Sequence, residues 1–456
     1  MKLKTFPGGV HPPQYKDLTK GKPIEDMPVP IKVIIPLQQH TGAPCEPLVK
    51  VGDEVKEGQK IGESKAFVSA PVHTSISGKV TAIEPRPHPA SAKDVMAIVI
   101  EKNPESAEVS ARPPMLHLGT PSLQTESWKE LTPKQIKEKI RESGIVGLGG
   151  AAFPTHVKLS PAPDKKIDTV ILNGVECEPY LTNDHRLMLE KTSQILEGLN
   201  IILKVLGVNR ASIGIESNKQ DAIKVMENAE HSYEVGGRDA LHGISIEVVP
   251  LKVKYPQGAE KQLIKAILNR EVPSAGLPFD VGVIVQNVGT ALAIYEAVVT
   301  DKPLIERVVT VTGNGIKEPK NLRVRIGTPF SQVIEYCSGF VNGVSKVIMG
   351  GPMMGLAQYT LDVPVVKGTS GILVLKDIKE ESEGPCIKCG RCVESCPMSL
   401  MPNRIGDYAE TDNFDLCKEY GVFDCMECGA CAYVCASRRP LIHLIKYAKS
   451  RLAAKK

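Results

Sequence analysis

The sequence lacks several features that would each indicate a class of protein. Aromatic residues make up only 4% of its 456 residues, with a single tryptophan, and the formal net charge is only +4. Because no basic block with interleaved aromatic residues occurs, nucleic acid is not an expected partner. No apolar run approaches the roughly 20 residues that span a bilayer. Nothing at the N-terminus resembles a signal peptide. We therefore expect a soluble or peripheral protein in a reducing cytoplasm.

The cysteines are concentrated in the last quarter of the chain. Two runs share the spacing C-x2-C-x2-C-x3-C: Cys386, Cys389, Cys392 and Cys396, then Cys425, Cys428, Cys431 and Cys435. This spacing is typical of bacterial proteins with two [4Fe–4S] clusters, in which the fourth cysteine of each run ligates the other cluster. Structural zinc would use two cysteine pairs for one tetrahedral site, and disulfides would need an oxidising compartment. We therefore predict one cluster on Cys386, Cys389, Cys392 and Cys435, and another on Cys425, Cys428, Cys431 and Cys396.

The first hundred residues predict an arm followed by a small all-β unit. Proline and glycine between Thr5 and Pro13 favour an extended arm. Short β-type runs then alternate with Gly and Pro turns, at 31–36, 48–51, 60–61, 78–83 and 96–100. Pro- and Ser-rich residues 103–126 indicate a linker. The pattern around Gly52 and Gly78 resembles a biotinyl/lipoyl barrel; Lys65 lies near the carrier-lysine position, but its spacing is too short, so we interpret the unit as a structural barrel.

An α/β region follows the linker. Thr132, Pro133 and Gln135 predict a helix start with a capping box, and Ile136 and Ile140 share one face of that helix. Strand-like runs at 168–172, 211–215, 244–249 and 281–285 alternate with helical stretches, including 187–206. This order predicts a parallel sheet covered on both faces. Ligands bind such sheets beyond the carboxyl ends of the strands, where the polar segments of this region lie, so we expect one shared site.

The residues of this expected site resemble a known family. Four segments resemble the FMN- and NADH-binding subunit of respiratory complex I. They are the glycine-rich loop 147–155, the segment Asn173 to Pro179, the segment Tyr255 to Glu260, and Asn287 with Thr290. With Gly350 to Gly355 and the cysteine runs, the order of regions resembles the C subunit (RnfC) of the Rnf electron-transport complex.

The Rnf resemblance implies a multidomain α/β and β fold. The implied parts are an extended arm (1–30), a barrel-sandwich hybrid domain (31–102), a linker (103–127), a Rossmann-like parallel α/β domain for FMN and NADH (128–304), a β-grasp SLBB domain (305–376) and a ferredoxin-like α-helical domain with two [4Fe–4S] clusters (377–456). Within it, the SLBB domain is interpreted as a spacer, with Gly350 to Gly355 forming tight turns near the flavin domain.

The resemblance also implies roles for individual residues. The FMN phosphate and ring would be wrapped by Gly147, Gly149, Gly150 and Lys158. The isoalloxazine or ribityl chain would be bonded by Asn173, Glu176, Asn287 and Thr290. Near the nicotinamide nucleotide would lie Phe153, Glu178 and Glu260. Tyr255 and Gly258 complete the cofactor-binding set. Without a nucleotide contact, the alternatives are a core position for Phe153 and a strand-end surface position for the Glu178 carboxylate. Leu148, Ala152, Val175, Ala259 and Gly289 depart from the complex I pattern, three of them replacing acidic residues.

The function implied is that of a peripheral subunit at the cytoplasmic face of the membrane. It would take a hydride from NADH at FMN and pass single electrons through the clusters, reversibly, to a ferredoxin-like iron–sulfur subunit of a membrane Rnf complex that moves ions. No catalytic acid–base pair is expected. Two alternatives are a soluble flavin/iron–sulfur reductase of the cobalamin-reductase type and a relay that has lost nucleotide binding. The basic end (Lys446, Lys449, Arg451, Lys455, Lys456) is either a solvated tail or a docking element.

Four cysteines lie outside the two runs. Cys337 and Cys417 are interpreted as ordinary buried thiols, and Cys177 falls within the expected flavin segment. Cys45 has no assigned role.

Overall fold

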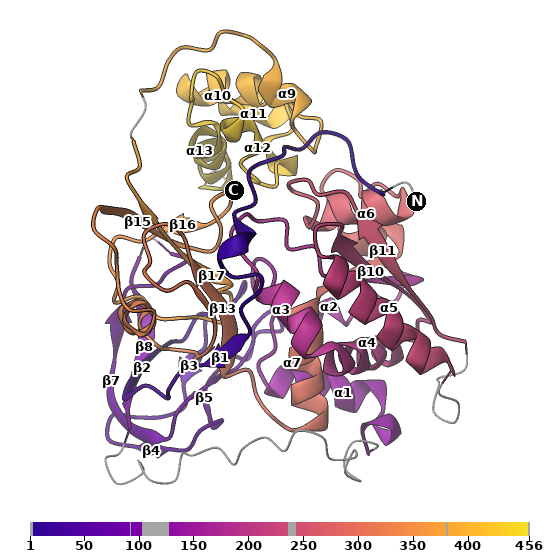
Figure 1. Cartoon of the computed structure of the whole chain (residues 1–456), viewed down its shortest axis with the longest axis vertical. Coiled ribbons are helices and arrows are strands. Elements are labelled where there is room, and N and C mark those ends of the chain that lie inside the picture. The colour runs from indigo at the N-terminus through magenta and orange to yellow at the C-terminus, as the bar shows by residue number, and fades with distance from the viewer. Residues whose placement is uncertain (1–2, 92, 103–126, 236–242, 380–381, 455–456) are drawn as a thin grey trace.

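The computed structural model describes residues 3–91, 93–102, 127–235, 243–379 and 382–454, with side chains described up to residue 229 in the helix that ends at 235. The predicted linker, except its last residue, and the last two lysines of the basic end lie outside the described residues. We call the helical region of the two cysteine runs (377–456) the cluster domain and the α/β region (128–304) the flavin domain. Figure 1 shows the cluster domain at the top, above the flavin domain on one side and, on the other, the N-terminal β unit (31–102) and the SLBB region (305–376). Among the described residues, no helix is both long and apolar enough to cross a membrane.

The N-terminal β unit consists of two small antiparallel sheets. One has the order β2 (Lys32–Pro36), β8 (Val95–Glu101), β7 (Gly78–Arg86), β4 (Glu54–Val55), and the other β3 (Glu46–Pro47), β5 (Lys60–Glu63), β6 (Val72–His73). The strand expected at 48–51 is wrong: Leu48 and Val51 are 55% and 60% exposed, and the chain turns there. Only Val49 of this run is buried, so the run has no continuous buried face for a strand. Lys65 is exposed between β5 and β6.

The predicted parallel sheet is confirmed. Its order is β11 (Ser245–Leu251), β10 (Arg210–Glu216), β9 (Thr169–Asn173), β12 (Val283–Asn287), and every pair is parallel. Alternate residues face opposite layers. Val170 and Leu172 join the core that contains α4 (Thr192–Leu206) and α7 (Val288–Val299), whereas Ile171 joins the core that contains α6 (Glu260–Leu268).

The helices of this domain follow the expected pattern with one correction. In α1 (Pro133–Glu142) the capping box of Thr132 and Gln135 forms, and Ile136 and Ile140 are fully buried. The single helix expected at 187–206 is two helices, α3 (Asn183–Glu190) and α4, because Lys191 leaves the helical conformation with φ −134°. The remaining helices are α2 (Thr155–Lys158), α5 (Gln220–Val235), and the 3-10 turns η3 (Ser127–Glu130) and η4 (Pro278–Val281).

The SLBB sheet takes one strand from the N-terminal arm. Its order is β1 (Ile24–Asp26), β14 (Lys320–Arg325), β13 (Glu306–Thr312), β17 (Gly371–Lys376), β15 (Val344–Met349), β16 (Leu356–Ala357), with α8 (Phe330–Tyr336) packed on it. Before β1, the arm forms one 3-10 turn, η1 (Lys16–Leu18), and crosses the molecule from the cluster domain to the SLBB sheet (Figure 1). The arm thus contacts three domains.

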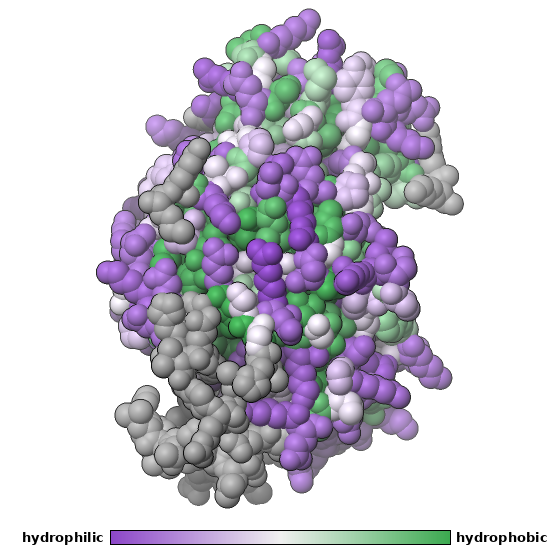
Figure 2. Space-filling view, turned by 90° about the vertical axis from the view of Figure 1, so that its right-hand side faces the viewer, coloured by the Kyte–Doolittle hydropathy of each residue, from purple (hydrophilic) through white to green (hydrophobic). Residues whose placement is uncertain are grey.

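The cluster domain is built from short helices around the two cysteine runs. They are α9 (Arg391–Glu394), α10 (Pro402–Glu410), α11 (Phe414–Glu419), η5 (Val422–Asp424), α12 (Ala430–Tyr433) and α13 (Leu441–Ala454). At the basic end, Lys446 and Lys449 lie beside Glu427. Figure 2 shows the cluster domain as a separate lobe above a mainly hydrophilic face of the flavin domain.

Candidate functional site

The site begins where the strand order of the parallel sheet reverses. β9, β10 and β11 follow one another outward in one direction, and β12 then returns to the other side of β9. Asn173 and Asn287, the last residues of these two neighbouring strands, are register partners. A crevice outside such a reversal is the usual ligand site of an open α/β sheet.

The glycine-rich loop lies over this reversal. Gly149 and Gly150 are exposed, and a Cβ at Gly149 would come within 2.8 Å of the Asn287 side-chain nitrogen. The loop is closed by a hydrogen bond from Gly147 N–H to the Phe153 carbonyl (2.9 Å). The Leu148 N–H donates to the Thr290 hydroxyl (2.9 Å), and the buried Arg307 donates to the Leu148 carbonyl (3.1 Å). The loop therefore presents fixed backbone to solvent at the strand ends.

Asn287 and Asn173 hold the loops at these strand ends. Asn287 Oδ1 accepts from the N–H groups of Gly289 and Thr290, which caps α7, and its Nδ2 donates to Asp184 (2.7 Å). Asn173 Nδ2 donates to the Gly258 carbonyl (2.8 Å). The residues predicted from these three segments are thus brought together, with their side chains in mutual contacts that shape the site.

The two predicted carboxylates of the next segment also have protein partners. Glu176, with φ +48°, accepts from the N–H groups of Asp184 (2.7 Å) and His185 (3.3 Å) at the start of α3. Glu178 accepts from the N–H groups of Met353 (3.1 Å) and Met354 (2.8 Å), so it joins the flavin domain to the SLBB loop. Burial raises the pKa of Glu178 to about 7. Glu178 is therefore not a free surface carboxylate, and the loop at Gly350 to Gly355 packs against the flavin domain as expected.

The remaining predicted residues lie on the glycine loop and at the neighbouring ends of α2 and α6. Lys158 at the end of α2 forms an ion pair with Glu260 at the start of α6. Phe153 is 36% exposed, which contradicts the alternative of a core position and leaves its ring accessible.

A set of buried cations was not predicted. Lys16, from the N-terminal arm, donates to the carbonyls of Glu176 and Glu178 (both 2.9 Å), and burial lowers its pKa to about 8. Lys219 donates to the Val175 carbonyl (2.7 Å) and lies 3.3 Å from Glu216. These lysines carry no sequence motif, since the contacts join residues up to 162 positions apart.

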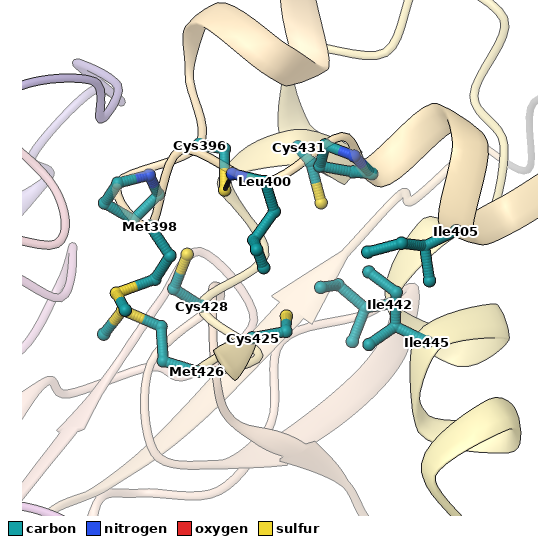
Figure 3. A pocket seen from close by; sticks show the side chains of 12 residues that line it. Cys396, Met398, Leu400, Ile405, Cys425, Met426, Cys428, Cys431, Ile442 and Ile445 are labelled. Carbon is teal, nitrogen blue, oxygen red and sulfur yellow. Dashed lines mark hydrogen bonds between the residues drawn. The ribbon is translucent and has the colours of Figure 1, made fainter. Parts of the chain in front are cut away.

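The cysteines surround two cavities in the predicted combination. One cavity is lined by Cys396, Cys425, Cys428 and Cys431, and the other by Cys386, Cys389, Cys392 and Cys435. Figure 3 shows the four sulfurs of the first set spaced around one shared opening. Within the described residues, no group of three or more His, Cys, Asp or Glu side chains is gathered as a site for one metal ion. Four sulfurs around a wider space match the donor set of an iron–sulfur cubane.

The two runs repeat the same backbone. Lys388 and Glu427 both have φ near +55° and donate N–H to the sulfurs of Cys386 and Cys425 (3.4 Å each). After the fourth cysteines, the N–H groups of Leu400 and Arg439 donate to Cys396 and Cys435, again at 3.4 Å. The second run keeps this turn although Ala436 replaces the proline of the first. Such N–H···S bonds stabilise thiolate ligands and tune a bound cluster.

Tyr255 lies between the flavin and cluster domains. Its side chain is buried, and its hydroxyl donates to the Cys428 carbonyl (2.7 Å). The neighbouring Cys177 is buried and accepts from the Gly258 N–H (3.3 Å), and burial raises the pKa of this thiol. Tyr255 and Cys177 therefore belong to the wall of the site that faces the cysteine runs.

Comparison with family models assigns each region to a domain type. The RnfC barrel sandwich hybrid domain matches residues 4–105, the Nuo51 FMN-binding domain 140–296, the SLBB domain 308–357 and a 4Fe-4S dicluster domain 378–436. The multidomain fold, an FMN domain and iron–sulfur clusters are thereby confirmed.

Two curated proteins are similar along nearly the whole chain. The C subunit of the proton-translocating ferredoxin:NAD(+) oxidoreductase complex of Clostridium ljungdahlii is 50% identical, covering 98% of this chain and 94% of the relative. The C subunit of the Na(+)-translocating ferredoxin:NAD(+) oxidoreductase complex of Acetobacterium woodii is 47% identical, covering 100% and 99%. This chain belongs to the RnfC family of Rnf complex subunits. It is therefore an oxidoreductase subunit of a multi-subunit ion-translocating complex.

A solved structure shares the fold. An NAD+-reducing [NiFe]-hydrogenase superposes with a TM-score of 0.52 at 18% identity, covering 72% of this chain and 63% of the hydrogenase chain. At that identity the likeness supports the architecture alone.

Proposed function

We propose that this subunit exchanges a hydride with NAD(H) at FMN and relays single electrons through two [4Fe–4S] clusters. Its partner would be a ferredoxin-like iron–sulfur subunit, and the membrane subunits would couple the transfer to ion movement. The subunit would sit peripherally at the cytoplasmic face of the membrane. The observation that carries the proposal is the contact of Tyr255, at the wall of the flavin crevice, with Cys428 of a cysteine cavity.

The residues around the crevice fit a flavin nucleotide. The exposed backbone of Gly149 and Gly150 lies over the strand-order reversal, where N–H groups can approach a phosphate or a ring edge. Lys158 supplies a positive charge beside this loop, held in place by Glu260. When bound, the flavin supplies the conversion between a two-electron hydride donor and one-electron carriers.

The chain's own contribution is to position the reactants. Thr290 and Arg307 hydrogen-bond the glycine loop from two elements, and Asn287 holds Thr290 by capping α7, so the loop backbone is preorganised before a ligand arrives. Phe153 is exposed at the same loop and offers a ring on which a base of the nicotinamide nucleotide could stack. Glu178 and Glu260 border that side of the site.

Spectroscopy of anaerobically prepared protein tests this proposal. We expect bound FMN, about eight irons per chain, and bleaching of the flavin and cluster absorption on addition of NADH or recovery on addition of NAD+ to reduced protein. Protein that holds both cofactors but responds to neither nucleotide would contradict it. Co-purification with membrane subunits separates this function from that of a free cobalamin-reductase type enzyme.

A further inference from the structure

The N-terminal β unit contacts the glycine loop of the flavin domain at the bend of that loop. The hydroxyl of the exposed Thr41 donates to the Ala151 carbonyl (2.7 Å), and the Thr41 N–H donates to the Ala152 carbonyl (3.3 Å). Ala151 and Ala152 stand between Gly150 and Phe153 in the loop. One residue of another domain therefore holds both carbonyl groups of the bend.

The bend contains an unfavourable backbone conformation. Ala152 has φ +52°, in the left-handed region, where a Cβ is crowded by the neighbouring carbonyl oxygen. Such a conformation persists only where the surrounding structure fixes it from several sides. Ala152 is buried, and a Cβ at Gly368 of the SLBB region would lie 3.7 Å from its Cβ. The hydrogen bonds of Thr41 are therefore among the contacts that keep the bend in this conformation.

A second loop of the β unit contacts the residues that follow the bend. His156 on α2 donates from Nε2 to the Phe67 carbonyl (3.1 Å). The Phe67 ring meets the His156 ring edge to face, with the two centroids 5.8 Å apart. The β unit thus contacts the polypeptide on both sides of Phe153, at Ala152 and at His156.

The two loops of the β unit are joined to each other. Ala43 N–H donates to the Val68 carbonyl (3.0 Å), and Ala70 N–H donates to His40 Nε2 (3.1 Å). At Gly42, which has φ +123°, a Cβ would lie 2.1 Å from the Val68 carbonyl oxygen, so the two backbones touch. The loops that carry Thr41 and Phe67 therefore act as one support.

A buried lysine of the SLBB region ties this support to the start of the glycine loop. Lys367 N–H donates to Gln39 Oε1 (3.1 Å), beside the Thr41 loop. Its Nζ donates to the carbonyls of Pro71 and Gly144 (both 2.7 Å), and Gly144 lies three residues before the glycine loop. Three domains thus meet around one end of the loop, and the β unit is fixed before a ligand arrives.

We propose that the N-terminal β unit forms part of the nucleotide site, with Thr41 as the positioning residue that holds the bend and so orients the Phe153 ring for NADH. This inference rests on the proposed function. Thr41 contacts the loop next to Phe153, whereas Thr290 and Arg307 hold the other end of the loop at Leu148. Loss of the Thr41 hydroxyl should therefore weaken nucleotide binding and leave FMN content and the rate at saturating NADH unchanged.

Three threonine variants test the role with the full-length, anaerobically prepared protein that holds FMN and clusters. Thr41→Val removes the hydroxyl but keeps the side-chain shape and the backbone N–H. In an NADH:ferricyanide assay its KM for NADH should rise about fivefold, the effect of one hydrogen bond, with kcat and FMN content as in the wild type. Thr41→Ser keeps the hydroxyl and should restore the wild-type KM. Thr81→Val, at an exposed threonine on β7 of the same β unit, is the control.

Hydrogen exchange of the loop gives a second measurement that needs no nucleotide. The Gly147 N–H donates to the Phe153 carbonyl and the Thr155 N–H donates to the Ile145 carbonyl, so both amides are protected while the loop stays closed. In Thr41→Val, mass spectrometry should show exchange of the peptide 145–157 about fivefold faster than in the wild type. Thr41→Ser and Thr81→Val should exchange at the wild-type rate.

The outcomes separate this role from the proposed function. If wild-type protein with both cofactors does not respond to NADH, the proposed function fails, and the exchange rates alone decide whether Thr41 holds the loop. If the wild type responds, an unchanged KM in Thr41→Val overturns the inference. A lower kcat or lost FMN with unchanged KM shows a purely structural role and overturns it too. A KM raised equally in Thr41→Ser or Thr81→Val, or wild-type exchange in Thr41→Val, has the same consequence.

Discussion

Substitution of Gly150 by alanine should weaken FMN binding without destabilising the fold. A Cβ at Gly150 would meet no heavy atom within 4 Å, and its backbone is not in the left-handed region. An alanine that fits its site leaves stability within about 0.5 kcal/mol or raises it by about 0.4–1 kcal/mol, because it restricts the unfolded chain. If the flavin occupies the open space above this loop, the added methyl group meets the ligand alone.

Gly149→Ala should behave differently because the protein itself fills the space. Its Cβ would lie 2.8 Å from Nδ2 and 3.0 Å from Cγ of Asn287, whose side chain caps α7 and binds Asp184. Asn287 cannot move away without losing these bonds. Overpacking and a weakened helix cap cost about 1–3 kcal/mol. Gly149→Ala should therefore lower both stability and FMN affinity.

Two measurements separate the effects. Denaturant unfolding of FMN-free protein gives the stability, and quenching of flavin fluorescence on titration gives the Kd for FMN. For Gly150→Ala we expect a Kd raised at least about tenfold, or about 1.4 kcal/mol, with unfolding as in the wild type. Gly21→Ala, in equally open surroundings on the arm, should change neither quantity. Wild-type FMN affinity in Gly150→Ala would refute the placement of the flavin on this loop.

Three further predictions concern the cysteine runs and the buried carboxylates. Cys396→Ala and Cys435→Ala should each disturb the EPR spectra of both clusters, since each cysteine belongs to one run and lines the cavity of the other; a change in one spectrum only would contradict the pairing. Burial would raise the pKa of Glu306, but Lys302, Arg323 and Arg325 outweigh it and hold the pKa at about 2. The stabilisation that ionised Glu306 gives the folded protein is therefore complete above pH 4.5 and is lost as the pH falls towards 2. In urea unfolding, Glu306→Gln should lower the free energy of unfolding by about 3 kcal/mol at pH 7 and by less at pH 4. The control, the exposed Glu318→Gln, should lower it by under about 0.5 kcal/mol. Burial raises the pKa of Glu178 to about 7, so this residue should reduce the free energy of unfolding as the pH rises from 4.5 to 7. Over that range the free energy of unfolding of Glu178→Gln should rise by about 3 kcal/mol relative to that of the wild type. Plots of this free energy against pH that run parallel for the two proteins would refute the prediction.

Local spacing in the sequence predicted the features that depend on near neighbours. The cysteine runs place three ligands within seven residues, so their grouping follows from the chain itself, and the structure brings the fourth cysteines to the opposite cavities. The ends of β9 and β12 were predicted to share a site because parallel strands bring their carboxyl ends to one edge. The capping box at Thr132 likewise depends on three residues of separation.

Features that depend on remote partners were not predicted. The buried position of Lys16 requires the arm to reach carbonyl groups 160 and more residues away. The orientation of Tyr255 towards Cys428 depends on how the cluster domain docks, over 173 positions. The break at Lys191 is a smaller case: it falls in a polar run, Glu190 to Gln194, that contains neither Pro nor Gly, so the sequence alone predicted one helix.

One departure from the complex I pattern, Val175, follows from the balance of buried charge. Val175 is fully buried in the core shared with the cluster domain, where an aspartate would lose its hydration. The described residues around it already include four carboxylates, the buried Asp184 and Glu216 and the half-buried Glu176 and Glu178, and three buried cations, Lys16, Lys219 and Arg307. Burial, and then the charge of Glu176, already raises the pKa of Asp184 to about 7. A further carboxylate among these described residues would have no buried cation left to balance it. The apolar residue at 175 is therefore what this interface between flavin and cluster domains requires, and it gives no separate argument for a lost nucleotide site.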